Sequence, residues 1–186
     1  MRRLARLAIW GQGVGHNGAM ATCPKCGFTY GATPRPELSR RMSECGAAYG
    51  SRLAADAVVL RARPNPEQWS PLEYACHTRD IALMQSDRLY VALVEDEPSF
   101  KPMYREQRVV FDRYDMQTPA AVAAQVKMAA DLLANAFAGL EDAQWSRTLI
   151  YGFPDPARRD VEWMAHHTLH ELVHHLADID GMVGAA

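Results

Sequence analysis

Two helix-start signals constrain the fold of this chain more than any other feature of its sequence. In SPLE, at residues 70–73, the serine suits a helix cap, the proline suits the first helical position and the glutamate completes a capping box. In TPAA, at residues 118–121, a threonine cap is again followed by proline. A helical pattern follows each start, to about Glu95 and to Gly139 respectively. Both segments therefore predict long helices.

Two further amphipathic patterns complete the set of helices. The first covers about residues 36–61, and the last runs from the cap Asp160 to about Gly181. Four such helices with two long connections predict an all-α four-helix bundle over residues 36–186, preceded by an N-terminal extension over residues 1–35.

The two connections carry different signals. EDEPSFKPMYREQRVVFDRYDMQ, residues 95–117, is long, aromatic and charged, which is typical of a functional loop, although a simple crossover would look the same. EDAQWSRTLIYGFPDPAR, residues 141–158, contains one candidate strand, SRTLIYG.

Composition excludes some classes of protein. The 20 basic and 22 acidic residues nearly balance, which argues against nucleic-acid or membrane-surface binding driven by net charge. No apolar run is long enough for a membrane span. Four cysteines are too few for a disulfide scaffold, so we expect reduced thiols and a cytoplasmic location. Residues 1–19 begin like a signal peptide without its long apolar segment; we expect them to be disordered or to follow from a start codon placed too early.

The last helix is rich in histidine, because five of the seven histidines lie within residues 166–175. His170 and His174 are four residues apart and share one helix face, although His166 and His170 form a competing pair. A metal site needs a third ligand, and His77 is the candidate on the predicted core face of its helix. Three histidines and water would make an open site for a divalent ion.

Two other interpretations of these histidines remain. HELVH matches the string of zinc proteases, but the extended motif requires glycine and histidine where this chain has Ala177 and Asp180. Histidines on helices are also commonly surface or core residues without a ligand. The histidine stripe lies nearly opposite a leucine-rich stripe on the helical wheel, so either one stripe forms a homodimer contact or one lines an open cleft.

Taken together, these segments resemble the DinB-like family, also called the S-transferase-like superfamily, which includes mycothiol-dependent maleylpyruvate isomerase. The resemblance lies in WSPLEYACHTRD, EDEPSF, LEDAQWSRT and HTLHELVHHLADI, and covers about residues 36–181. It is closest to actinobacterial members with a CPKCGF-like N-terminal segment. The resemblance implies a four-helix bundle and a zinc or nickel ion held by three histidines, which carry over as His77, His170 and His174.

The resemblance also implies transfer or isomerisation chemistry with a low-molecular-weight thiol such as mycothiol. A metal-bound thiol would ionise at neutral pH and attack a small electrophile held under the first connection. Tyr104, Arg105 and Arg108 are the candidates for contacting the substrate; for the arginines, solvated loop charges are the alternative. A metal-bound water would give a hydrolase instead. A non-catalytic, stress-linked protein that binds metal or a small molecule is the other function class.

Cys23 and Cys26, in CPKCGF, form the knuckle of a zinc ribbon, with a glycine for the tight turn. A complete four-cysteine site would require Cys45 and Cys76 to converge on them. A redox pair and plain thiols are the alternatives. A zinc-ribbon nucleic-acid adaptor is disfavoured, because the second cysteine pair is missing and the chain is slightly acidic.

Overall fold

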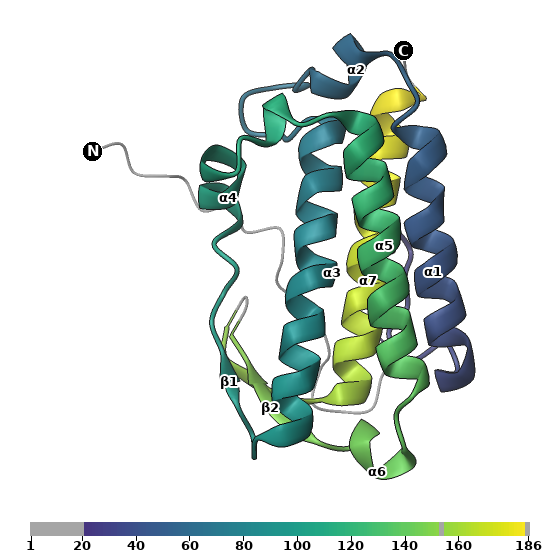
Figure 1. Ribbon diagram of the computed structural model, residues 1–186, viewed down its shortest axis with the longest axis vertical. Coiled ribbons are helices and arrows are strands. Elements are labelled where there is room, and N and C mark those ends of the chain that lie inside the picture. The colour runs from purple at the N-terminus through teal and green to yellow at the C-terminus, as the bar shows by residue number, and fades with distance from the viewer. Residues whose placement is uncertain (1–20, 153–154, 185–186) are drawn as a thin grey trace.

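The computed structural model describes residues 21–152 and 155–184, so the expectation for residues 1–19 lies outside them. Four long helices form a bundle (Figure 1): α1 Arg35–Arg52, α3 Pro71–Val94, α5 Pro119–Ala138 and α7 Val161–Val183. Helices α1 and α3 each pack against both α5 and α7. The predicted all-α four-helix bundle is confirmed.

The predicted helix starts follow from local hydrogen bonds. Ser70 Oγ accepts from the N–H of Glu73 at 3.3 Å, and Glu73 Oε2 accepts from the N–H of Ser70 at 2.8 Å, which completes the capping box of α3. Arg63 donates to both oxygens of Glu73. Asp160 caps α7 through its side chain. Thr118 occupies the cap position of α5, but its side chain makes no capping hydrogen bond.

The first predicted helix is shorter than expected. Instead of one helix over residues 36–61, α1 ends at Arg52 and a separate short helix, α2, covers Ala57–Arg61. Asp56 explains the break, because its side chain accepts from the N–H of Val58 at 2.7 Å and starts the new helix.

Close packing holds the helices together. A side-chain carbon added at Gly46 would lie 2.5 Å from the Ala130 Cβ, so glycine lets α1 approach α5 at this point. The buried Tyr49 hydroxyl on α1 donates to the carbonyl of Leu172 on α7 at 2.9 Å and contacts Thr78 Oγ1 on α3 at 3.1 Å.

A three-stranded sheet brings the two connections together beside α3 (Figure 1). Strand β1 (Ser99–Phe100) pairs in parallel with β2 (Thr148–Tyr151), and β2 pairs antiparallel with β3 (Ala157–Asp160). The candidate strand in SRTLIYG is therefore confirmed, while β1 and β3 were not predicted. The connections also contain α4 (Arg105–Phe111), a 3-10 turn (Tyr114–Met116) and α6 (Asp142–Trp145).

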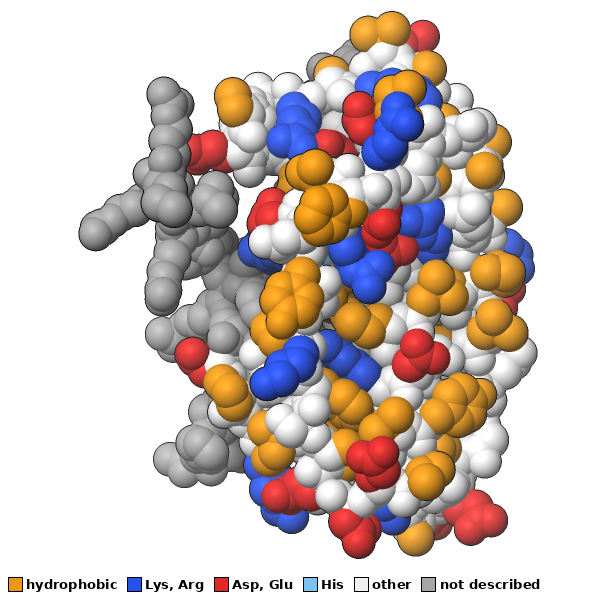
Figure 2. Space-filling model, turned by 60° about the vertical axis from the view of Figure 1, so that its left-hand side comes forward, with side chains coloured by type: hydrophobic (Ala, Val, Ile, Leu, Met, Phe, Trp, Pro, Cys, Tyr) orange, Lys and Arg blue, Asp and Glu red, His pale blue; other side chains and the backbone are white. Residues whose placement is uncertain are grey.

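The described surface carries charges of both signs. On the face shown in Figure 2, basic and acidic side chains are interspersed with hydrophobic ones rather than segregated. Within residues 21–152 and 155–184, no helix combines the length and apolar character that crossing a membrane requires.

Candidate metal centre

A cavity of about 1140 Å³ opens beside α3 and α7. The N-terminal segment, residues 21–30, forms part of one wall, and the start of α4 with the residues before it forms another. The histidine stripe of α7, including Trp163, His167 and His170, lines this cavity. The helical wheel left open whether a stripe of this helix lines an open cleft; in the structure the histidine stripe does.

Three buried side chains meet in the cavity wall: His77 from α3, and Glu171 and His175 from α7. Their ligand atoms all lie within 4.8 Å of one another. Glu171 Oε2 and His175 Nε2 are 3.5 Å apart, close to the separation of about 3.4 Å for two ligands of one tetrahedral zinc ion. His77 Nδ1 is buried without a hydrogen bond, as expected for a nitrogen that could bind an ion. The donor set therefore fits a divalent metal.

Electrostatics prepares Glu171 and His77 for a cation. Burial opposes ionisation of Glu171, but its contacts with His170 and His175 hold the pKa of that carboxyl well below its ordinary value. Burial and the neighbouring His175 lower the pKa of His77, which keeps its imidazole neutral. The Nδ1–H of His175 donates to Asp178 Oδ2 at 2.9 Å, which orients Nε2 towards Glu171.

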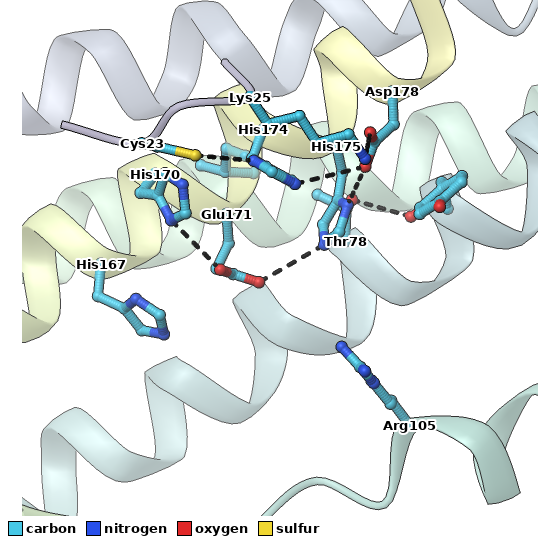
Figure 3. Close-up of polar contacts among 12 residues, drawn as sticks. Cys23, Lys25, Thr78, Arg105, His167, His170, Glu171, His174, His175 and Asp178 are labelled. Carbon is cyan, nitrogen blue, oxygen red and sulfur yellow. Dashed lines mark hydrogen bonds and ion pairs between the residues drawn. The ribbon is translucent and has the colours of Figure 1, made fainter. Parts of the chain in front are cut away.

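Among the described residues, no single group of potential metal ligands holds the predicted trio of His77, His170 and His174 together. His77 lies with Glu171 and His175, whereas His170 and His174 lie with Cys23 and Cys26. Figure 3 shows Cys23 beside His174. The two pairs on α7 have the same spacing of four residues but point about 100° apart, because they are offset by one residue.

The spacing of Glu171 and His175 in the sequence also indicates a pair of metal ligands. Glu171 and His175 are also an i, i+4 pair, but counting histidines alone leaves the glutamate out.

The predicted substrate-binding residues lie in two places. Tyr104 and Arg105 line the cavity, and Figure 3 shows Arg105 reaching from α4 towards Glu171 and His175. Arg108 lies outside the lining of this cavity; its guanidinium donates to the Met103 carbonyl and pairs with acidic side chains, including Asp80.

The other two cysteines do not join the CPKCGF knuckle. Cys76 is buried on α3 with its Sγ 3.6 Å from Gln117 Oε1, and Cys45 lies on α1. Among the described residues, neither belongs to a group that could hold a metal. The four-cysteine site is therefore not formed, because the two helices hold these thiols elsewhere.

Comparison with known proteins identifies the class to which this bundle and its histidines belong. The DinB superfamily profile matches residues 53–179, and the chain belongs to that superfamily. The structure is similar to that of YfiT from Bacillus subtilis, described as a probable metal-dependent hydrolase with an unusual four-helix bundle topology. The TM-score is 0.70 with 14% sequence identity, over 81% of this chain and 87% of YfiT, which shows a common fold. A search of curated protein sequences found no match.

Proposed function

We propose that this protein is a metal-dependent enzyme in which His77, Glu171 and His175 hold a zinc or nickel ion at the cavity wall. One observation carries the proposal: three buried groups with metal-binding atoms converge within 4.8 Å beside a large cavity. Three protein ligands leave a coordination position open, which is typical of catalytic rather than structural sites.

Hydrolysis is the reaction that the donor set supports best. Two histidines and a glutamate are the ligands of several hydrolytic zinc enzymes, and YfiT is described as a probable metal-dependent hydrolase. The ion would lower the pKa of a water molecule and polarise a substrate carbonyl. Asp178 would hold the ring of His175 in place through the hydrogen bond to Nδ1. Arg105 would bind an anionic group of the substrate, since it reaches towards the same ligands (Figure 3).

Thiol transfer or isomerisation is the second candidate, and the size of the cavity favours it. At about 1140 Å³, the cavity exceeds the range of roughly 300–1,000 Å³ for ordinary small-molecule pockets. This space would accommodate a low-molecular-weight thiol such as mycothiol beside a small electrophile. Basic side chains of Lys25, Arg105 and Arg159 in the lining would attract carboxylates on either molecule.

The test compares two histidine variants of the full chain. Purified protein is analysed for metal, then assayed for hydrolysis of chromogenic esters and amides and for conjugation of an electrophile with mycothiol. We expect His175→Gln to lose about one metal equivalent and all metal-dependent turnover. His166→Gln is the matched control, because His166 is buried on the same helix but does not line the cavity.

The outcomes separate the proposals. Hydrolysis without conjugation supports the first reaction, and conjugation alone supports the second. Unchanged metal and turnover in His175→Gln would contradict the site. Metal binding that depends on His175, with no turnover in either assay, would instead indicate the non-catalytic binding protein. A cytoplasmic location and a homodimer stay predictions.

A further inference from the structure

We propose that Cys23, Cys26, His170 and His174 form a second, closed metal site, in which a structural zinc ion fastens the N-terminal segment to α7. This inference is independent of the catalytic proposal, because it uses none of His77, Glu171 and His175 as ligands. Two thiolates and two imidazoles are a common donor set of structural zinc.

The geometry of the four donors fits tetrahedral zinc. Their ligand atoms all lie within 4.8 Å of one another, although Cys23 and His174 are 151 residues apart in sequence. Cys23 Sγ lies 3.5 Å from His174 Nδ1 (Figure 3). With Zn–S near 2.3 Å and Zn–N near 2.0–2.1 Å, a tetrahedral ion places sulfur and nitrogen about 3.6 Å apart.

The N-terminal segment has the backbone of a metal-binding knuckle. The N–H of Cys23 donates to the Phe28 carbonyl at 2.8 Å, and the N–H of Gly27 donates to the Cys23 carbonyl at 2.9 Å. Gly27 has φ +72°, a conformation that favours glycine. The turn thus presents two sulfurs to one point.

Neighbouring side chains orient the two imidazoles. The Tyr30 hydroxyl lies 3.1 Å from His170 Nδ1, which directs Nε2 of that ring to the ion. In His174 the roles reverse: Nδ1 faces Cys23, and Nε2 lies 3.7 Å from a carboxylate oxygen of Asp178. Each ring therefore has one nitrogen for the metal and the other next to a polar group of the protein.

An ion pair also connects the knuckle to α7. Lys25, between the two cysteines, places its Nζ 2.5 Å from Asp178 Oδ1. The same segment supplies Thr22, Cys23 and Tyr30 to the cavity lining. A zinc ion with four protein ligands has no open position for substrate. Its role would be to hold this wall of the cavity in place beside the catalytic centre.

A redox pair is the competing role for the two cysteines. It requires only the two sulfurs, and it gives no reason for His170 and His174 to converge on them. The four-donor arrangement therefore favours zinc.

Cobalt substitution tests the site spectroscopically. Full-length protein is loaded with Co²⁺, which gives a thiolate-to-metal charge-transfer band only where sulfur binds the ion. We expect the band in the unmodified protein, a weaker band in Cys23→Ser because Cys26 still supplies one thiolate, and loss of the band when both Cys23→Ser and Cys26→Ser are made. In His174→Ala we expect the band to weaken or shift, because one nitrogen ligand is lost. Cys45→Ser is the matched control, since Cys45 is also partly buried but outside the site.

The same experiment separates this site from the catalytic one. In His77→Ala we expect the charge-transfer band to remain while metal-dependent turnover is lost. A band that is absent from the unmodified protein, or that survives the double change Cys23→Ser and Cys26→Ser, would overturn the proposal. A band unaffected by His174→Ala would also overturn it, because the histidine would not be a ligand.

A measurement on the unmodified protein guards against a folding defect in the variants. Zinc-loaded protein is alkylated before and after treatment with a chelator, and the modified cysteines are located by mass spectrometry. We expect Cys23 and Cys26 to react only after zinc is removed, while the reactivity of Cys45 stays the same. Equal reactivity of Cys23 and Cys26 with and without chelator would contradict a zinc site here.

Discussion

Replacing Asp178 with asparagine tests whether this carboxylate supports the metal ligands. Its side chain is 3% exposed and pairs with Lys25 Nζ at 2.5 Å. Its Oδ2 accepts the Nδ1–H of His175 at 2.9 Å and lies 3.7 Å from His174 Nε2. Asparagine preserves the shape of the side chain but removes the negative charge, so both imidazoles become weaker ligands.

The size of the effect follows from these contacts. Loss of a carboxylate that supports a ligating histidine typically lowers metal affinity by about 10–100-fold, or roughly 1.4–2.8 kcal/mol. The Lys25 side chain is 54% exposed, so losing its ion pair adds only about 0–1 kcal/mol. We expect the larger loss at the site of His175, because that hydrogen bond is much shorter than the contact with His174.

The assay is metal affinity by competition with a chromogenic chelator at neutral pH. Asp180→Asn is the control, because Asp180 lies on the same helix but is 49% exposed and pairs with Arg52 away from the site. Equal affinities in Asp178→Asn and the unmodified protein would refute the supporting role. An equal loss in both variants would show that only net charge matters.

Three further predictions concern stability, each measured by urea unfolding of the variant and the unmodified protein. Gly46→Ala should lower the unfolding free energy by about 1–3 kcal/mol through overpacking. Gly50→Ala is the control: it has open space around it and should raise the unfolding free energy by about 0.5–1 kcal/mol. Equal effects of the two changes would contradict the close approach of α1 to α5 at Gly46. Tyr49→Phe should cost about 1–2 kcal/mol through its buried hydrogen bonds, and no loss would show that they contribute nothing. Glu73→Gln should cost about 1–2 kcal/mol at neutral pH. Burial opposes ionisation of Glu73, but Arg63 lowers the pKa of its carboxyl. The difference in unfolding free energy should therefore be present above the ordinary glutamate pKa and disappear as the pH falls through the lowered pKa of Glu73. A difference that does not depend on pH would refute the ion pair.

Much of the fold could be predicted because its causes are local. The capping box at Ser70 and Glu73 depends on residues three positions apart, and the side-chain cap of Asp160 is equally local. The break at Asp56 is local too, but one side-chain hydrogen bond decided between a single long helix and two helices. Strand β1, only two residues long, gives no alternating pattern and forms because β2 lies beside it.

The sequence by itself determined the four long helices of this protein. It also determined that α7 carries histidine and glutamate side chains spaced one turn apart. Only the tertiary structure decided which pair meets His77, because a one-residue offset turns a side chain by about 100° around the helix. Packing against α3 places Glu171 and His175 beside His77. The same rotation turns His170 and His174 towards Cys23 and Cys26, from a segment far away in sequence. Helical spacing shows which residues share a face, but the partner of that face depends on contacts between distant parts of the chain.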